Sequence, residues 1–266
     1  MNIKKWSLVA IAGMLAATMA LFGCSSGDQG GASNAAGSDG GVKLVNDGKL
    51  TVAASLDFPP FENLNGDKPE GFAVELMNAL AQEMGLECEY LPSTKFDTIV
   101  PLIQAGGKAD VGVSSFTITD KRLQQVDFTD SYCDVNQSLT VRKDSGITEV
   151  SQLEGKKIGA QSGTTGYEWA AENIKGAEVT AYDEMTAVFA ALDSGQIDAI
   201  SVDLPVANYY VKAYSDCQVI KEIPTGEQYA IAVSKENPQL TKDLNEALKA
   251  VRDNGTYDEL VAKWLK

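Results

Sequence analysis

The chain has 266 residues, of which 44% are hydrophobic, and a formal net charge of -15. This length fits one large domain or two small ones. The negative charge argues against nucleic acid as a partner, because Lys and Arg must replace the counterions along the phosphates. The chain has no histidine, which excludes Ser-His-Asp and Cys-His nucleophile pairs and imidazole zinc sites. We therefore expect a protein that is not an enzyme and needs neither cofactor nor metal.

Residues 1–23 have the layout of an export signal. A short basic start, MNIKKW, precedes the apolar run SLVAIAGMLAATMALFG, which ends at Cys24. This run is short for a membrane-spanning helix, which needs about 20 residues, and it is typical of a secretory signal; an uncleaved membrane helix is the alternative. The sequence LFGC resembles the lipobox of bacterial lipoproteins, which implies cleavage before Cys24 and a lipid on its sulfur.

Residues 24–45 are predicted to form a flexible tether. The stretch SSGDQGGASNAAGSDGG has almost no apolar side chain to bury, so it cannot form a core. A lipid at the start of a tether anchors the protein to the extracytoplasmic face of the cell membrane.

The three other cysteines have no CxxC spacing, so they form no redox or metal motif of that type. They are Cys88, Cys133 and Cys217. At most one pair among them could form a disulfide, and the sequence does not choose it. We expect buried thiols.

Strands and helices alternate in the chain from residue 48. Strands are predicted at 48–55, 86–91 and 109–113 from apolar runs and alternation. Helices are predicted at 72–84 and 96–105, each followed by glycine as a stop signal. This βαβαβ order requires a parallel sheet with crossover helices.

The same pattern then begins again. Strands are predicted at 155–160, 177–182 and 197–202, and helices at 167–174 and 184–192. The two halves resemble each other, although βαβ units share turn chemistry and a chance likeness is the alternative. The remainder is predicted to be one strand followed by helices that start near Pro238.

Four loops follow the predicted strands and carry polar or charged residues. They are SLDFPPFE, SSFTITDKR, QSGTTG and VDLP. Ligands of open α/β sheets bind beyond the carboxyl ends of the strands, so these loops are the candidate site.

The four loops combine a cation, hydroxyls, an anion-binding turn and an acid. Arg122 has the planar fork that suits a carboxylate, and Ser115 and Thr117 add hydroxyls. The turn at 163–165 leads into a helix start, where free N–H groups favour an anion. Asp203 supplies a carboxylate. A ligand with both a carboxylate and an ammonium group would satisfy both signs, and such a ligand is an amino acid.

Each candidate also has an ordinary structural alternative. Arg122 could pair with Asp120 or Asp127 on the surface. Asp203, before Leu204-Pro205, could be a helix N-cap. QSGTTG could be a simple turn, since it is not the GxxxxGK[ST] phosphate loop. The remaining side chains could cap a helix or fill a core: Ser115, Thr117, Phe58 and Phe96.

Several motifs between residues 48 and 266 are recognisable together. They include FPPFE, FDTIVPLIQAG, ADVGVSSFTITDKR, VDFTDSY, LEGKKIGAQSGTT and GQIDAISVD. This set resembles the extracellular solute-binding proteins (family 3 type) of polar amino-acid ABC importers. The resemblance implies an α/β, two-lobed, periplasmic-binding-protein-like (type II) fold, with a βαβ-type sheet and flanking helices in each lobe.

The resemblance also implies how the chain is divided between the lobes. Residues 46–134 plus 232–266 would form lobe 1, and residues 135–231 would form lobe 2. Two strands, near Cys133–Gln137 and Gln228–Ala232, would make the hinge.

The resemblance further implies roles for individual residues. Arg122 would bind the ligand α-carboxylate, assisted by Thr117 and the Thr165 amide. The α-ammonium would bind Asp203, the Ser115 carbonyl and the Thr117 hydroxyl. The other expected contacts, which include two aromatic rings around the ligand side chain, are Phe58, Phe96, Ser55, Ser114, Gln161 and Thr164.

The side-chain positions favour a neutral polar ligand such as glutamine or cystine. Relatives that bind lysine or arginine often carry an acid where this chain has Ser55, which with Gln161 would hydrogen-bond the ligand. Lys95 is the only additional cation in these loops. An inward-pointing Asp57 would instead favour a basic ligand.

The predicted mechanism is capture by hinge closure and delivery to the membrane subunits of an ABC permease by a monomeric binding protein. The alternatives are an amino-acid sensor lipoprotein and a dehydratase-like enzyme on the same scaffold.

Overall fold

The computed structural model describes residues 42–266. The predicted signal peptide, the predicted lipidation site Cys24 and most of the predicted tether lie outside the described residues. Within 42–266, no helix combines the length and the apolar character needed to cross a membrane.

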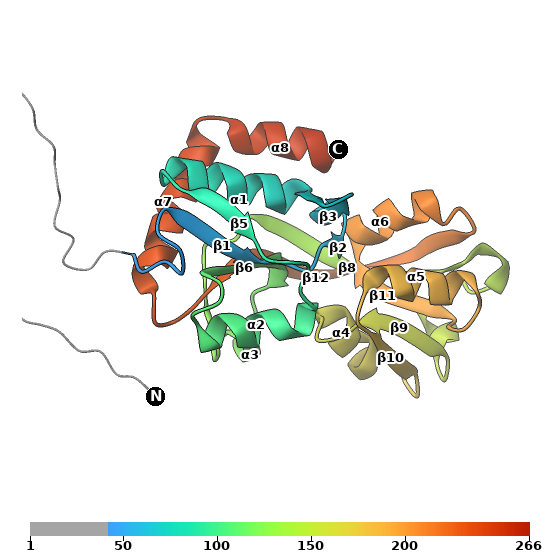
Figure 1. Ribbon diagram of the computed structural model, residues 1–266. Coiled ribbons are helices and arrows are strands. Elements are labelled where there is room, and N and C mark those ends of the chain that lie inside the picture. Colours follow the sequence, from blue (N-terminus) through green and yellow to red (C-terminus); the bar gives the residue numbers. More distant parts are fainter. Residues whose placement is uncertain (1–41) are drawn as a thin grey trace, which may run out of the picture. The chain divides into compact units, whose positions relative to one another are not determined.

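One mixed sheet of nine strands runs through the molecule (Figure 1) in the order β10-β9-β11-β8-β12-β6-β1-β5, with β7 paired to β12. Neighbouring strands are parallel within the group β5, β1, β6 and within the group β10, β9, β11, whereas β8 and β12 run antiparallel to their neighbours. The bounds are β1 Lys49–Ala53, β5 Glu87–Tyr90, β6 Val111–Thr117, β7 Asp127–Phe128, β8 Cys133–Arg142, β9 Lys157–Gln161, β10 Glu178–Tyr182, β11 Ala199–Asp203 and β12 Cys217–Val233.

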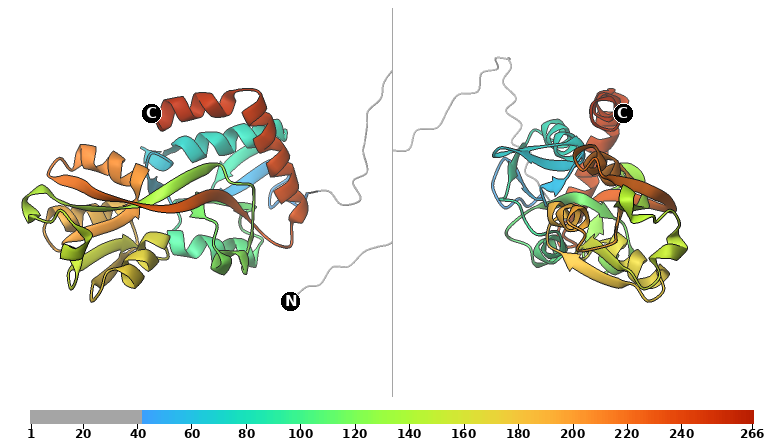
Figure 2. Two further views of the ribbon diagram at one scale, coloured as in Figure 1. Left: turned by 180° about the vertical axis from the view of Figure 1, so that it is seen from behind. Right: turned by 90° about the vertical axis from the view of Figure 1, so that its right-hand side faces the viewer.

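The two parallel groups form two lobes. We call the part around β1, β5 and β6 lobe 1 and the part around β9, β10 and β11 lobe 2. The long strands β8 and β12 pair with each other and connect the lobes (Figure 2). The predicted α/β two-lobed fold is confirmed, and the two predicted crossing segments lie on β8 and β12. The residue bounds of the lobes stay a prediction.

Helices cover both lobes (Figure 1). The C-terminal helices α7 and α8 pack against α1 on lobe 1, because α7 presents an apolar face of leucines and Val251 to the same core as α1. The bounds are α1 Phe72–Glu83, α2 Phe96–Ala105, α3 Asp120–Leu123, α4 Thr165–Asn173, α5 Met185–Asp193, α6 Leu204–Ala213, α7 Pro238–Asp253 and α8 Thr256–Trp264, with short 3-10 turns η1 Lys143–Ser145 and η2 Val150–Leu153.

The strand predicted at 109–113 is longer than expected. β6 continues to Thr117, and each of its residues is buried. Ser114, Ser115 and Thr117 are therefore strand residues rather than loop residues. Their hydroxyls can be buried without a large cost because each has a hydrogen-bond partner from a distant part of the chain. A local polarity pattern cannot reveal such distant partners.

A small antiparallel sheet lies within the segment predicted as the loop SLDFPPFE and its continuation. It consists of β2 Asp57–Phe58, β3 Glu62–Asn65 and β4 Lys68–Glu70. Strands of two to four residues are too short for alternation to show, so the sequence did not predict them. This sheet places Asp57, Phe58 and Glu62 beside the ends of β1 and β6.

Candidate ligand-binding site

The Arg122 side chain is held at the boundary between the lobes. It comes from the short helix α3, where the Arg122 N–H donates to the N-cap hydroxyl of Thr119 at 3.2 Å. The guanidinium lies 5.3 Å from the Phe96 ring centroid and 5.4 Å from that of Phe116, a cation–π arrangement. The two rings therefore fix where this cation lies.

Two carbonyl oxygens, one from each lobe, accept hydrogen bonds from Arg122. Nη1 donates to Thr117 O at 2.7 Å and Nη2 to Gly163 O at 3.1 Å, which leaves further N–H groups of the fork for a ligand. The alternative of a surface ion pair with Asp120 or Asp127 is wrong, because the residue is only 8% exposed. Burial lowers the pKa of Arg122.

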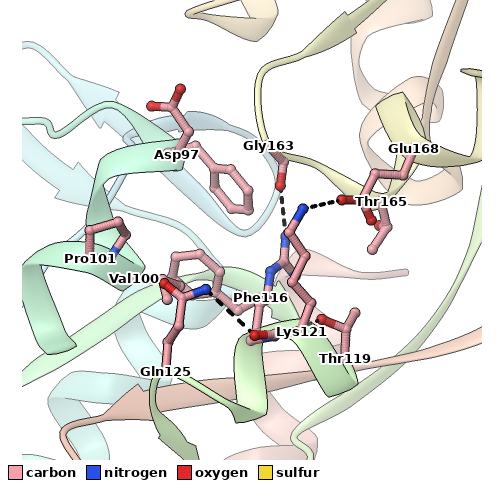
Figure 3. A pocket seen from close by; sticks show the side chains of 12 residues that line it. Asp97, Val100, Pro101, Phe116, Thr119, Lys121, Gln125, Gly163, Thr165 and Glu168 are labelled. Atoms are coloured by element: carbon pink, nitrogen blue, oxygen red, sulfur yellow. Dashed lines mark hydrogen bonds and ion pairs between the residues drawn. The ribbon is translucent and has the colours of Figure 1, made fainter.

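A cavity of about 160 Å³ adjoins this guanidinium. Figure 3 shows Asp97 and Phe116 of lobe 1 on one side and Gly163 and Glu168 of lobe 2 on the other. An ion pair between Lys121 and Glu168, at 2.7 Å, joins the lobes at its edge. Arg122 thus borders an open space between the lobes.

Asp203 lies at the N-cap position of α6, but its side chain makes no capping bond. Instead Gln137 Nε2 on β8 donates to Asp203 Oδ1 at 3.0 Å. The alternative that the carboxylate caps the helix is therefore wrong. Burial, and next the charge of Glu227, raise the pKa of Asp203 to about 7.

Glu227 on β12 is a site residue that the sequence analysis missed. Thr117 of lobe 1 and Thr165 of lobe 2 each donate a hydroxyl hydrogen bond to Glu227 Oε2 at 2.6 Å. The Thr165 hydroxyl also accepts from Gln137 at 3.2 Å. In the sequence, Glu227 follows Gly226 in a stretch typical of a solvated turn, so no local signal reveals this contact.

The Asp57 carboxylate lies between Ser55 and Gln161, the two residues predicted to bind the ligand side chain. The Ser55 hydroxyl donates to Asp57 Oδ1 at 2.7 Å, and Gln161 Nε2 lies 3.3 Å from Oδ2. The Met185 N–H, at the start of α5 in lobe 2, donates to Oδ2 at 2.6 Å. The inward orientation that favours a basic ligand is thus present.

The other predicted contacts lie close by. The Ser114 hydroxyl accepts from the Ser55 N–H at 3.2 Å, and Ser115 bonds to Glu62. Phe58 belongs to the core of lobe 1. Thr164 is the N-cap of α4, since its hydroxyl accepts from the Tyr167 N–H at 3.2 Å. The structure thus gives Phe58 and Thr164 structural roles, and their ligand contacts stay predictions.

Acidic groups predominate around the site. The residues assigned to it include the carboxyl groups of Asp57, Asp203 and Glu227 and the guanidinium of Arg122. Lys95, the additional cation of the loops, forms an ion pair with Asp183 across the exposed rim. The four side chains assigned to the site thus comprise three acids and one cation.

The cysteines within residues 42–266 are free thiols. Cys217 is buried, and Cys88 and Cys133 are half-buried. Burial raises the pKa of Cys88 and of Cys133 to about 12. These thiols are therefore protonated at neutral pH and are weak nucleophiles.

Comparison with known proteins gives matches to one family over nearly all of the described residues. Residues 50–266 match the family described as bacterial extracellular solute-binding proteins, family 3. An arginine-binding extracellular protein of Bacillus subtilis (strain 168) is 33% identical over 98% of this chain and 98% of its own length. The glutamine-binding protein of an ABC transporter from the same organism is 32% identical over 99% and 97%.

A solved structure supports the same assignment. An ancestral arginine-binding protein bound to arginine is 37% identical, and the match covers 82% of this chain and 99% of that chain with a TM-score of 0.78.

Proposed function

The chain belongs to family 3 of the bacterial extracellular solute-binding proteins, and on that premise we propose that it captures a cationic amino acid of the arginine class for an ABC transporter. Amino-acid binding itself follows from the family and from relatives named for the arginine and glutamine that they bind. Those names describe binding rather than catalysis, which favours a binding role over the enzyme alternative. The new element of the proposal is the charge of the ligand side chain.

The observation that carries this proposal is the inward carboxylate of Asp57. With an amino acid in place, its α-carboxylate would pair with Arg122 and its α-ammonium with Asp203. Asp57 would then be a half-buried carboxylate without a cation, and removing a charge from water is costly unless it is paired. A guanidinium or ammonium on the ligand side chain supplies that cation, and a guanidinium binds a carboxylate with two parallel hydrogen bonds.

The arrangement of the lobes supports capture by closure. Contacts from lobe 1 to lobe 2 include Arg122 to Gly163, Asp57 to Met185 and Asp97 to Ser162. Residues that would hold the two ends of the ligand come from both lobes. A ligand that bridges them binds the closed state better and shifts the population toward it.

A neutral polar ligand such as glutamine or cystine is the second candidate. It is favoured by the hydrogen bonds that Asp57 already accepts from Ser55, Gln161 and Met185, which partly stabilise its charge. In that case Ser55 and Gln161 would turn toward the ligand side chain.

We expect Asp57→Asn to separate the two candidates. In the wild-type protein, isothermal titration calorimetry should give tighter binding for L-arginine than for L-glutamine. Asp57→Asn should weaken arginine binding at least about tenfold, which is about 1.4 kcal/mol, because the paired carboxylate charge is lost. Glutamine binding should change much less.

Asp97→Asn is the matched control for this experiment. Asp97 also bonds across the lobes, because the Ser162 hydroxyl donates to Asp97 Oδ2 at 2.8 Å, so the loss of its charge should change closure equally for both amino acids. An equal loss of arginine and glutamine binding in Asp57→Asn would show that Asp57 stabilises closure only. Tighter wild-type binding of glutamine would favour the neutral candidate.

We also propose that the protein is anchored through a lipid on Cys24 at the extracytoplasmic face of the membrane, and that it works as a monomer beside its permease. The support is the LFGC sequence after the apolar run. Cys24→Ser should move the protein from the membrane fraction to the soluble fraction of the producing cells, because the thiol that carries the lipid is gone. Unchanged membrane association of Cys24→Ser would contradict this proposal.

A further inference from the structure

Ser115 has an unusual backbone conformation for its residue type. Its φ is 50°, and among residues 42–266 no other residue except glycine has a positive φ. An L-residue with a side chain adopts this left-handed conformation only at a cost. The conformation therefore requires a compensating interaction.

A bulge in β6 accompanies this conformation. Phe116 pairs with Ala230 of β12, whereas Gly112 pairs with Ala232. Residues 113–115 of β6 thus face a single residue of β12. A β-bulge breaks the pairing locally and changes the direction of the residues in it, so Ser115 has lost its regular partner on the neighbouring strand.

Glu62 supplies the hydrogen bonds that this part of the strand has lost. The Ser115 N–H donates to Glu62 Oε1 at 2.9 Å, and the Ser115 hydroxyl lies 3.1 and 2.9 Å from the two carboxyl oxygens. Glu62 is 0% exposed, and burial raises its pKa to about 8. No lysine or arginine among the described residues forms an ion pair with it. The hydrogen bonds of its carboxyl group all go to Ser115.

Glu62 is itself held by a rigid support. It pairs with Phe58 in the small sheet. The preceding carbonyl oxygens, of Pro60 and Phe61, accept hydrogen bonds from the first N–H groups of α1 at 2.9 and 3.0 Å. Gly71 permits this approach, since a Cβ there would lie 2.2 Å from Phe61 O.

The residues on either side of Ser115 belong to the candidate site. Ser114 bonds to the Ser55 backbone, and Thr117 bonds to Glu227 through its hydroxyl and to Arg122 through its carbonyl. A change of the Ser115 backbone would therefore displace the groups that surround the ligand.

We propose that Glu62 is a positioning residue of the ligand site, which holds the Ser115 backbone in its left-handed conformation and so sets the place of the carbonyl oxygen that receives the ligand α-ammonium. This inference rests on the proposed function. Glu62 acts through Ser115 and does not touch the ligand. Since every α-amino acid carries the same ammonium group, Glu62 affects affinity for all of them alike, in contrast to the side-chain selectivity of Asp57.

A double-mutant cycle tests the proposal. Glu62→Ala should weaken the binding of L-arginine and L-glutamine by a similar factor of at least about ten. Ser115→Gly alone should weaken binding less than Glu62→Ala does, because glycine adopts a positive φ without steric cost and keeps the backbone carbonyl. Adding Ser115→Gly to Glu62→Ala should recover a large part of the lost affinity. A role in packing alone predicts no such recovery.

Glu62→Gln provides the conservative comparison. The amide keeps one oxygen that can accept from the Ser115 N–H, so its loss of affinity should be smaller than that of Glu62→Ala. If Glu62→Ala does not fold, Glu62→Gln with and without Ser115→Gly completes the cycle. Unchanged affinity in both Glu62 variants, or a loss that glycine does not relieve, would overturn the proposal.

The melting temperatures of the unliganded variants test the interaction between Glu62 and Ser115 without any ligand. Glu62→Ala should melt lower than the wild type, and Ser115→Gly should reduce that difference if the two residues act through one backbone conformation. Suppose that Ser115→Gly reduces the melting-temperature difference but the wild type binds no amino acid. That result would contradict the proposed function and would still support the interaction between Glu62 and Ser115. Binding by the wild type without any thermal or affinity coupling would overturn the Glu62 inference alone.

Discussion

Arg122→Ala is expected to reduce amino-acid affinity by at least about 100-fold, which is about 2.8 kcal/mol, while the protein stays folded. The guanidinium is buried beside two stacked aromatic rings and keeps N–H groups free for an anion. Hydrogen bonds to charged groups contribute about 1.5–3 kcal/mol each, and a carboxylate takes two from one guanidinium. Titration calorimetry with L-arginine and L-glutamine would measure the loss, which should affect both ligands.

Two further variants control this result. Arg122→Lys keeps a positive charge but loses the planar fork, so its affinity should fall between those of the wild type and Arg122→Ala. Arg142→Ala removes an arginine that bonds to Asp144 and to the Leu192 carbonyl and should leave binding unchanged. Circular dichroism would show that each variant is folded. An Arg122→Ala affinity within about threefold of the wild type would contradict the carboxylate role.

The affinity for amino acids is expected to fall as the pH decreases below 7. Burial raises the pKa of Asp203 to about 7 in the unliganded protein, and the ligand ammonium should lower it by stabilising the ionised form. Above pH 7 the carboxylate is already ionised and binding exchanges no proton. Below pH 7 binding must release that proton, so affinity should fall by up to about tenfold per pH unit. Calorimetry between about pH 5 and 8 would measure this slope.

Asp203→Asn separates Asp203 from the other titratable groups nearby. Glu227 and Tyr229 influence the same carboxyl group, and burial raises the pKa of Glu62 to about 8. The variant should bind weakly at pH 8 and lose most of the pH dependence between 5 and 7. A slope that persists in Asp203→Asn would assign the proton to one of the neighbours.

The stability of the unliganded protein should change with pH in the opposite sense. An unfolded aspartate has a pKa of about 3.9, lower than the value of about 7 for Asp203 in the folded protein. The contribution of Asp203 is therefore fully present below about pH 4 and is lost as the pH rises through 7. Glu62, with its pKa raised to about 8, acts in the same direction. Low pH thus favours the folded protein through these two groups while it weakens ligand binding.

The sequence by itself determined the elements whose signals are local. The helix predicted at 96–105 has those bounds as α2, because its apolar spacing and the glycines after it lie within one short window. The βαβ order alone decides which ends of the strands share an edge, and ligands bind beyond the carboxyl ends. This rule selected Arg122 and Asp203 from the sequence. The structure places both residues at the boundary of the lobes.

Only the tertiary structure decided which groups these side chains meet. Ser115 bonds to Glu62, 53 residues away, and Thr117 to Glu227, 110 residues away. No pattern within one element carries such a pairing, so the hydroxyls after ADVGV resembled a loop although they are buried in β6. The orientation of Asp57 depends likewise on the start of α5, 128 residues later. The direction of a side chain at a strand end is set by what packs across it, and for this chain that direction decides the ligand charge that the site favours.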